Sequence, residues 1–338
     1  MDKGTSSRSK CKFCFYIHTM NEQNNLTLLS FVIPCYRSEN TIETVVSEIR
    51  TTVQNQNAES KDGRVFDYEI VLVNDCSPDG VWGKIKQLVS ADKKIKGICL
   101  AKNFGQHNAL MAGYAEATGD YVISLDDDGQ TPASESFKLV NKLEEGFDVV
   151  YGYYEHSAQH LFRRFGSWVN KKMAEAIIGQ PTTLKTTSFF IMKKFIAKEI
   201  VQYPNPFPYI SGLVFRATKN LGNVAVGHRH RLQGESGYTI AGLIGLWVNG
   251  FTAFSVKPLR AATFIGILCA IIGFAAGLFV IYEKLTVASA PIGYASLLST
   301  LLFVGGMIMF LLGLIGEYVG RVYICINQAP QYVIREKV

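Results

Sequence analysis

Short, almost continuously apolar runs alternate with longer mixed stretches through the first half of the chain. The apolar runs predict five buried strands: 26–33, 67–74, 95–100, 120–125 and 147–152. The stretches between them predict four helices: about 40–56, 81–91, 106–117 and 134–145. Nearly continuous apolar strands that alternate with helices are typical of a largely parallel sheet covered on both faces, so we expect an α/β domain.

The pattern changes after about residue 260, where two long apolar runs follow. Ala261–Tyr282 and Ala295–Gly316 each contain 22 residues without a charge. A helix of that length crosses a hydrocarbon core of about 30 Å. Two buried core helices are the alternative, but two uncharged runs of this length disfavour it. We predict a C-terminal hairpin of two transmembrane helices.

The charges around these runs predict the orientation of the hairpin. Lys257 and Arg260 precede the first run, Arg321 follows the second, and the loop between them carries only Glu283 and Lys284. Positive residues favour the cytoplasmic side of a membrane. We therefore expect a multi-pass protein of the plasma (inner) membrane, with the large domain and both termini in the cytosol.

The composition limits the class of protein, its partners and the state of its cysteines. Of the 338 residues 48% are hydrophobic and 18% charged, which is little charge for a purely soluble protein. The net charge of +6 does not indicate nucleic acid as a partner and suits a protein beside an anionic leaflet. The seven cysteines are scattered and are expected to be free thiols.

Residues 1–25 are expected to form a disordered tail, within which Met20 is an alternative start.

A polar, turn-rich segment follows each of the first four predicted strands. The four segments read "PCYRSEN", "DCSPDG", "AKNFGQHN" and "DDDGQTP". Because ligands of open parallel sheets bind outside the carboxyl ends of the strands, we expect these segments to meet at one edge and form a site.

The acidic segment within "SLDDDGQTP" predicts the chemistry of this site. If the chain stays extended past Leu125, Asp126 and Asp128 share one side, together with Gln130, and Asp127 faces the other. Two carboxylates and an amide oxygen suit Mg²⁺ or Mn²⁺, with positions left for phosphate oxygens. A solvated acidic loop is the favoured explanation for such a pair alone, but its place beside three other polar loops favours a metal site.

Other residues of these loops are candidates for binding a nucleotide. Asp75 ends the second strand and could accept hydrogen bonds from a base or ribose, although a simple turn would also explain it. Lys102 and Asn103 could meet a nucleotide or only solvent. His107 is interpreted as a buried histidine at a helix start.

Several stretches resemble glycosyltransferase family 2. They are "FVIPCYRSENTI", "VLVNDCSPDG", "AKNFGQHNALMAGYAEATGDYVISLDDDGQTP" and "GFDVVYG", followed by "HRLQGESGYTIAGLIGLWVNGFTAFSVKPLR", "GEYVGRVY" and "APQYVI". The similarity is greatest to the polyprenyl-phosphate branch, the dolichol-phosphate mannose synthase and bactoprenol glucosyltransferase-like enzymes. It covers about residues 27–335 in order.

The resemblance implies a GT-A-type (Rossmann-like) domain over residues 26–238 that binds a nucleotide-sugar. Carried over by motif, three groups of residues acquire roles. Pro34, Tyr36 and Glu39 would line the nucleotide pocket with Asp75 near the base; Asp126, Asp128 and Gln130 would hold Mg²⁺ or Mn²⁺; and Arg231 and Ser236 would lie over the phosphates. Asp126, Asp128 and Arg231 are the catalytic candidates.

Three departures from the family pattern are visible. Asp127 and Gly129 replace a small or apolar residue and a leucine in the metal loop, and Gly237 stands where a lysine is common. The segment 184–192, "LKTTSFFIM", lacks the acid and the arginine of the family's "GDFRL", and Ser188 is the nearest positional match to that acid.

The acceptor of the sugar is expected to come from the bilayer. The stretches 160–177 and 239–256 combine apolar residues, tryptophan and nearby cations, which suits helices lying in the membrane interface. Four cations could bind a lipid phosphate or only lipid headgroups, and both interpretations stay open: Arg163, Arg164, Lys171 and Lys172. Residues 317–338 are expected to be a cytosolic tail.

The sequence therefore predicts an inverting glycosyltransferase that moves one sugar to a polyprenyl (undecaprenyl) phosphate at the cytosolic face, feeding cell-surface glycan modification. UDP-glucose is the favoured donor, and mannose from GDP stays open. A homo-oligomer and a flippase are conceivable partners. The alternatives are a catalytically silent relative that serves as a membrane scaffold or flippase partner, and a processive polysaccharide synthase, which one hairpin and the lack of a Q-x-x-R-W segment disfavour.

Overall fold

A computed structural model describes residues 26–60, 63–154, 181, 183–229, 257–286, 293–327 and 329–338 of the chain. The chain divides into two compact units. The first comprises residues 1–167, 181–236 and 330–338, and the second comprises 168–180 and 237–329. Each unit is described by itself.

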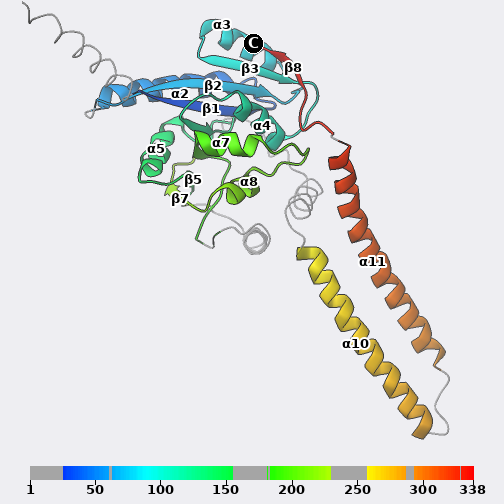
Figure 1. The fold of residues 1–338 in the computed structure, drawn as a ribbon. Helices are drawn as coiled ribbons and strands as arrows, with labels where there is room; N and C mark the ends of the chain where they lie inside the picture. Colours follow the sequence, from blue (N-terminus) through cyan, green and yellow to red (C-terminus); the bar gives the residue numbers. More distant parts are fainter. Residues whose placement is uncertain are drawn as a thin grey trace, which may run out of the picture. The chain divides into compact units, whose positions relative to one another are not determined.

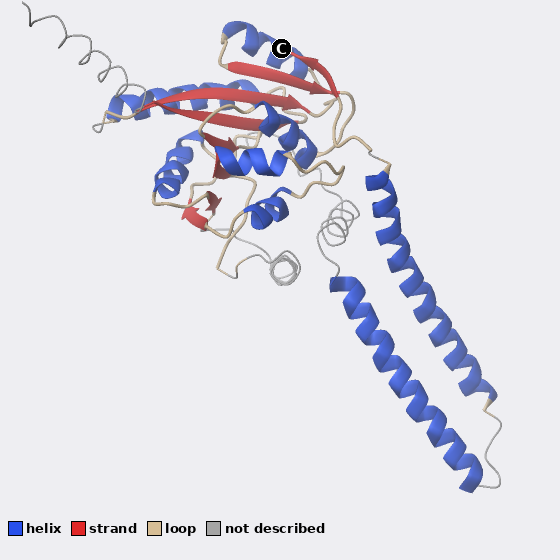
Figure 2. Cartoon of the chain, viewed as in Figure 1, coloured by secondary structure: helices blue, strands red, loops and turns tan. Residues whose placement is uncertain are grey.

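The first unit is built on an eight-stranded sheet, drawn as arrows in Figures 1 and 2. Its strands in spatial order are β7 (Leu221–Ala225), β5 (Val149–Tyr153), β6 (Phe190–Lys193), β4 (Tyr121–Ser124), β1 (Leu26–Cys35), β2 (Val65–Asn74), β3 (Ile95–Leu100) and β8 (Ile334–Lys337). The five strands predicted from apolar runs are β1 to β5, and all five are confirmed.

The centre of the sheet is parallel, as predicted. β1 pairs in parallel with both β2 and β4, and β2 pairs in parallel with β3. β6 and β8 run antiparallel to their neighbours, β6 between β4 and β5 and β8 beside β3. The carboxyl ends of β1, β2, β3 and β4 therefore lie along one edge, where the predicted polar segments begin.

Helices cover both faces of the sheet (Figure 2). The four predicted helices are confirmed: α2 (Ile42–Glu59), α3 (Val81–Ala91), α4 (Gln106–Glu116) and α5 (Ser136–Glu144). The described residues of this unit contain three further short helices: η1 (Ala133–Glu135), α7 (Lys194–Val201) and α8 (Ile210–Ala217).

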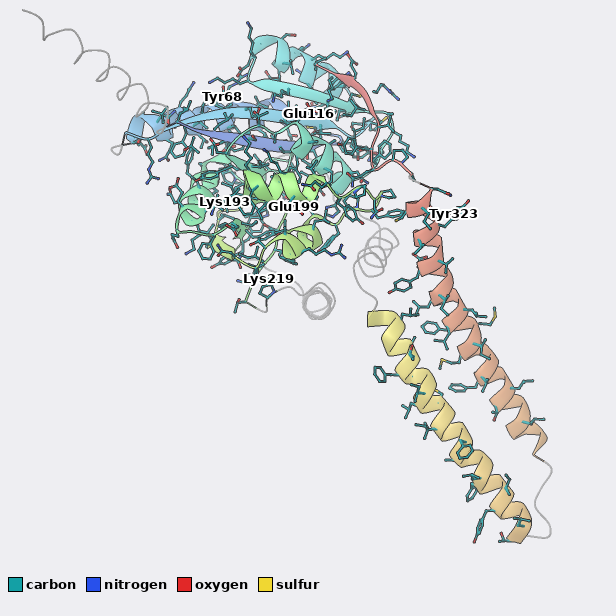
Figure 3. All side chains as sticks on the ribbon, in the orientation of Figure 1. Tyr68, Glu116, Lys193, Glu199, Lys219 and Tyr323 are labelled. Atoms are coloured by element: carbon teal, nitrogen blue, oxygen red, sulfur yellow. The ribbon has the colours of Figure 1, made fainter. Side chains whose placement is uncertain are left out.

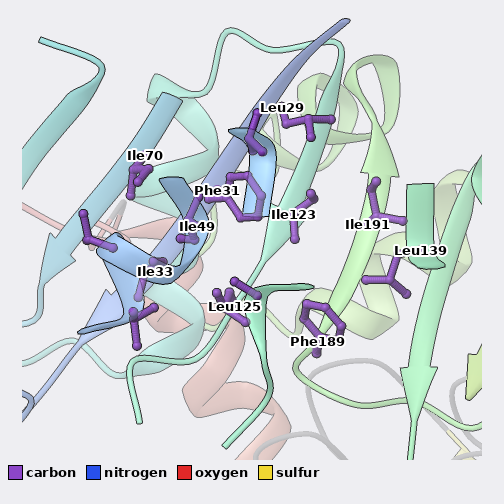
Figure 4. Packing of buried hydrophobic residues seen from close by; sticks show 14 of the residues in the cluster. Leu29, Phe31, Ile33, Ile49, Ile70, Ile123, Leu125, Leu139, Phe189 and Ile191 are labelled. Carbon is purple, nitrogen blue, oxygen red and sulfur yellow. The ribbon is translucent and has the colours of Figure 1, made fainter. Parts of the chain in front are cut away.

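Alternation along β1 divides the core between the two faces. Leu29, Phe31 and Ile33 are fully buried and belong to one apolar cluster with side chains of α2, α3 and α5 (Figure 4). On the opposite face, a methyl group added at Gly113 of α4 would lie 2.3 Å from Val32 Cγ1, so this helix packs directly on the strand. A sheet buried on both faces explains why its central strands are almost continuously apolar.

The second unit contains the two apolar helices, α10 (Lys257–Thr286) and α11 (Tyr294–Ile326). Segments long and apolar enough to cross a membrane occupy Ala262–Phe279 and Phe303–Ile326. Many large apolar side chains project outward from both helices (Figure 3), with Phe264 and Leu285 exposed by 73% and 82%. Exposed apolar surface of this extent marks an interaction site, and these helices indicate a membrane-associated protein.

The chain after α11 differs from a simple tail. α11 extends to Ile326, ten residues beyond the predicted end of the second span, and Ile334–Lys337 then form β8 at the edge of the sheet. The sequence analysis predicted none of β6, β7 and β8. The expected tail of residues 1–25 and the interfacial segments 160–177 and 239–256 lie outside the described residues.

Candidate functional site

Hydrogen bonds join the segments that follow β1 and β2. Arg37 donates its backbone N–H to Ser77 Oγ over 2.7 Å, and Glu39 donates its own to Asp79 Oδ2 over 3.0 Å. In return, Gly80 N–H donates to Glu39 Oε2 over 2.9 Å. Two loops that lie 40 residues apart in sequence thus fix one another at the carboxyl edge of the sheet.

Left-handed backbone occurs in both of these loops. Arg37 and Cys76 have φ angles of 58° and 50°, and they are the positive-φ residues other than glycine in the described parts of the chain. Residues other than glycine rarely adopt such angles, and sites of binding and catalysis are where they cluster. Each lies two residues beyond the end of its strand.

Asp75 connects the second loop to the third. Its side chain is buried, and its two carboxylate oxygens accept hydrogen bonds from the backbone N–H groups of Phe104 and Gly105 over 2.7 and 2.8 Å. Burial raises the pKa of Asp75, against the lowering effect of the two N–H groups. Asp75 therefore holds the loop that carries Lys102 and Asn103, and each of its oxygens keeps a second lone pair for a ligand.

Asp127 connects the acidic segment to the first loop. Its Oδ2 accepts the backbone N–H of Tyr36 over 2.9 Å, and Thr41 Oγ1 donates to its backbone carbonyl over 2.6 Å. Burial and the neighbouring charges of Asp126 and Asp128 raise its pKa to about 6. The prediction that Asp127 faces away from Asp126 fits these contacts. The premise of an extended chain is wrong, because the backbone turns at residues 127–128.

Asp126 faces a different set of partners. Gln106 Nε2, at the start of α4, donates to its Oδ1 over 2.9 Å, and Ser188 Oγ donates to its Oδ2. The sequence analysis did not select Gln106, although it stands in one of the four polar segments, and it assigned Ser188 no role. Ser188 occupies the divergent segment 184–192, so this segment reaches the acidic loop without a carboxylate of its own.

The acidic loop suits a divalent cation of the Mg²⁺ or Mn²⁺ kind. Within the described residues no group of three or more His, Cys, Asp and Glu side chains is arranged as a metal site. Asp126 and Asp128 offer two carboxylates, which are hard ligands, and the backbone N–H of Gln130 donates to Asp128 Oδ1 over 3.0 Å. A cation that keeps several waters and binds through one or two carboxylates and substrate phosphates needs no more protein ligands than these.

The residues that follow β7 contact the acidic loop. The backbone N–H of Arg229 donates to the carbonyl of Gln130 over 2.7 Å, and Tyr154 bonds to Thr131 over 2.6 Å while its ring packs against His228 with centroids 4.2 Å apart. The phosphate candidates Arg231 and Ser236 follow closely in sequence but lie outside the described residues, as does Gly237.

The remaining candidates occupy the rim of this edge. Pro34 is the penultimate residue of β1, and Tyr36, 44% exposed, carries the Arg37 guanidinium 5.5 Å from its ring centroid. Lys102 and Asn103 are exposed in the third loop. His107 packs against the Tyr209 ring, and burial lowers its pKa to about 4, which fits a buried, neutral histidine. The lipid-phosphate candidates Arg163, Arg164, Lys171 and Lys172 lie outside the described residues.

Comparison with known proteins identifies the family of the chain. Residues 30–201 match the model of glycosyl transferase family 2. The chain belongs to this family and is a glycosyltransferase. Residues 257–322, which include most of α10 and α11, match a second model, the GtrB C-terminal hairpin.

Two curated relatives align with this chain over nearly its whole length. The undecaprenyl-phosphate 4-deoxy-4-formamido-L-arabinose transferase of Shewanella sediminis is 30% identical over 94% of each chain. The prophage bactoprenol glucosyl transferase homolog of Escherichia coli is 29% identical over 91% of this chain and 98% of its own. Among solved structures, glucosyl-3-phosphoglycerate synthase of Mycobacterium tuberculosis with Mn²⁺ and UDP-glucose is 16% identical with a TM-score of 0.47, over 73% of this chain and 80% of that one.

Proposed function

We propose that this glycosyltransferase moves one sugar from a nucleotide-sugar, with UDP-glucose favoured, to a polyprenyl phosphate at the cytosolic face of a membrane. The observation that carries the proposal is the junction of four loops at the carboxyl edge of the sheet, with Asp126 and Asp128 beside the loops of Asp75 and Tyr36. The match to an undecaprenyl-phosphate transferase and a bactoprenol glucosyl transferase homolog supports the choice of acceptor.

The nucleotide would lie over the loops after β1, β2 and β3. Tyr36 offers an exposed ring, and Lys102 and Asn103 offer a cation and an amide on the neighbouring loop. Asp75 and Glu39 would act partly by holding backbone N–H groups, because both already accept from such groups. Their remaining lone pairs suit the N–H and hydroxyl donors of a base and a ribose.

The diphosphate would lie over the acidic loop. Asp126, Asp128 and Gln130 would hold the divalent cation, which when bound would neutralise the charge that develops on the leaving diphosphate. Gln106 and Ser188 would keep the Asp126 carboxylate in one orientation by donating to each of its two oxygens. Arg231 and Ser236 would contact the phosphates, and the bond from Arg229 to the carbonyl of Gln130 supports this placement of the segment.

The reaction itself needs little from the protein beyond positioning. A lipid phosphate carries close to two negative charges near pH 7, since its second pKa is about 6. One of its oxygens would attack the anomeric carbon while the bond from that carbon to the nucleoside diphosphate breaks, with the electron pair leaving on the diphosphate. No proton has to be removed from this nucleophile, so Ser188 in place of a carboxylate is compatible with catalysis. Direct displacement inverts the anomeric centre.

The topology of the chain supports an even number of membrane crossings. The sheet domain precedes α10 in sequence, and β8, which follows α11, belongs to the same sheet. If α10 and α11 cross the bilayer, both ends of the hairpin must therefore emerge on the side of the domain. Lys257, Arg260 and Arg321 at these ends favour the cytosolic side.

The proposal is tested with the detergent-purified full chain, undecaprenyl phosphate, Mn²⁺ or Mg²⁺, and a panel of nucleotide-sugars. Mass spectrometry of the organic extract should reveal lipid phosphate that has gained one sugar, with UDP-glucose as the best donor and no product in the presence of a chelator. Absence of product from every donor, with the protein folded and UDP still bound, would contradict the proposal.

One observation favours a second candidate, a silent relative that binds nucleotide-sugar as a membrane scaffold. The segment that reaches Asp126 presents the hydroxyl of Ser188 and no carboxylate. Metal-dependent binding of UDP-sugar without any lipid product would favour this candidate. Release of a polymer would instead indicate a processive synthase.

A further inference from the structure

The last residues of the chain form an integral part of the sheet. β8 lies beside β3 at the edge of the sheet (Figure 1) and pairs with it antiparallel. The pairing places Lys337 opposite Ile98, Glu336 opposite Cys99 and Ile334 opposite Leu100. The backbone of Val338 completes the ladder with two hydrogen bonds to Gly97, over 2.8 and 2.9 Å.

Side-chain contacts fix the position of β8 against α3 and β3. Glu336 accepts a hydrogen bond from Trp82 Nε1 over 3.1 Å and pairs with Lys86 over 2.6 Å, which ties β8 to α3. Gly97 leaves the space that the strand end needs, because a methyl group there would lie 2.7 Å from side-chain atoms of both Ile85 and Val338. A strand fitted in this way is a specific structural element of the domain.

Beyond the ladder, β8 contacts the loop that follows β3. The N–H of Ala101 donates to the carbonyl of Val333 over 2.8 Å, and Arg335 Nη2 donates to the carbonyl of Ala101 over 2.6 Å. Both backbone polar groups of Ala101 are thus bonded to the C-terminal segment. Three residues further on, Phe104 and Gly105 are bonded to Asp75.

The loop 101–105 is therefore fixed at both ends, by β8 at Ala101 and by Asp75 at Phe104 and Gly105. Lys102 and Asn103 lie between these two anchors, and their exposed side chains contact the loop itself: Asn103 Oδ1 accepts the N–H of Gly105 over 3.1 Å, and Lys102 Nζ lies 5.0 Å from the centroid of the Phe104 ring. Two independent supports leave little freedom to a loop of five residues.

We propose that β8 is a positioning element of the nucleotide site, in which Val333 and Arg335 hold Ala101 and so orient Lys102 and Asn103 toward the nucleotide. This inference rests on the proposed function, because it assumes that the loop binds the nucleotide of the sugar donor. It assigns the segment after the second apolar helix a role in donor binding, although the residues themselves do not touch the donor.

The test compares three variants of the full chain with the parent protein. Arg335→Met removes the bond to Ala101, Arg335→Lys keeps a cationic donor, and Lys337→Met is the matched control on the same strand, since Lys337 pairs with Glu116 and not with the loop. Two quantities are measured: amide hydrogen exchange at residues 104–105, and the KM for the nucleotide-sugar against the KM for the lipid phosphate.

For Arg335→Met we expect faster exchange at Phe104 and Gly105, whose N–H groups bond to Asp75 and not to β8. The KM for the nucleotide-sugar should rise by about two- to tenfold, the effect of one lost hydrogen bond, with kcat and the lipid KM nearly unchanged. Arg335→Lys should restore part of the effect, and Lys337→Met should match the parent protein.

A deletion of residues 332–338 provides the stronger perturbation. A strand with only a structural role would expose the amides that pair with it, at Gly97 and Ala101, and leave residues 104–105 as protected as before. That result, together with an unchanged nucleotide-sugar KM in Arg335→Met, would overturn the inference. The exchange measurement needs no catalysis, so inactivity of the parent protein with all donors would contradict the proposed function without deciding the outcome here.

Discussion

Glu69 provides the most quantitative prediction about this domain. It lies on β2 opposite Ser30 of β1, and its carboxylate accepts hydrogen bonds from Lys96 Nζ over 2.7 Å, from Thr118 Oγ1 over 2.9 Å and from Gly119 N–H over 3.1 Å. Ser30 Oγ and Thr118 N–H also donate to it. One buried carboxylate thus joins three strands to the turn between α4 and β4.

The pKa of Glu69 gives the size of the effect. Burial raises this pKa, but the hydrogen bonds from Lys96, Ser30 and Thr118 outweigh burial and lower it from 4.5 to about 2. Because each unit of pKa shift corresponds to 1.36 kcal/mol, the ionised group contributes about 3 kcal/mol to the free energy of unfolding at pH 7. A folded pKa below the unfolded one means that this contribution is present above about pH 4.5 and is lost as the pH falls toward 2.

We therefore expect Glu69→Gln to lower the free energy of unfolding of the sheet domain by about 2–3 kcal/mol at pH 7. The amide places an NH₂ group among donors, which leaves some of them without an acceptor. The difference between the two proteins should fall to about 1 kcal/mol at pH 3, because the carboxylate has by then lost most of its advantage.

The assay is urea unfolding of the detergent-solubilised full chain, read by a short pulse of amide exchange at fixed pH in peptides of β1 and β2. The matched control is Glu144→Gln, which breaks a partly exposed pair with Arg64 and should cost less than about 1 kcal/mol. A loss below about 0.5 kcal/mol for Glu69→Gln, or a difference that does not shrink at low pH, would refute the reasoning.

Three further substitutions test the site. Asp75→Asn replaces one acceptor of a backbone N–H by a donor, so the KM for the nucleotide-sugar, measured at saturating lipid, should rise by about tenfold or more. An unchanged KM would show that Asp75 has no part in donor binding. Ser188→Ala removes a hydrogen bond to Asp126, so the Mn²⁺ concentration needed for half-maximal activity should rise by about two- to tenfold in a metal titration. The same concentration in variant and parent would show that Ser188 does not support the metal site. Gly80→Ala should displace the Glu39 carboxylate, which lies 2.5 Å from the added carbon, and raise the nucleotide-sugar KM at near-constant kcat; a KM equal to that of the parent would contradict a pocket role for Glu39.

The central part of the fold was predictable because buried parallel strands leave a strong pattern. The runs at 26–33 and 67–74 are mostly apolar, since helices cover both faces of β1 and β2. β8 left no such pattern: Ile334–Lys337 has a single apolar residue, Ile334, and its strand conformation depends on pairing with β3, more than 200 residues earlier in sequence. Local preference carries little information about an edge strand of this kind.

The candidate site was predictable to the level of loops but not of side-chain contacts. The order of strands and loops suffices to bring Asp75, Tyr36 and Asp126 to one edge. The bond from Ser188 to Asp126 joins residues 62 positions apart, through a segment whose strand β6 runs against its neighbours. Asp75 was expected to face a ligand, and the structure adds a second role, because its oxygens accept the N–H groups of Phe104 and Gly105. Such contacts depend on tertiary packing, which sequence pattern does not encode.

The most direct test of the account is a comparison of Asp128→Asn with Asp67→Asn in the lipid-product assay. Asparagine at 128 keeps the oxygen that accepts the Gln130 N–H but removes the charge, whereas Asp67 pairs with Lys94 on the opposite side of the domain from the loops. The account predicts that Asp128→Asn lowers the rate of sugar transfer to undecaprenyl phosphate by about 100-fold or more, with the protein folded, and that Asp67→Asn leaves it unchanged. Equal rates for the two variants would contradict the assignment of the acidic loop as the catalytic centre.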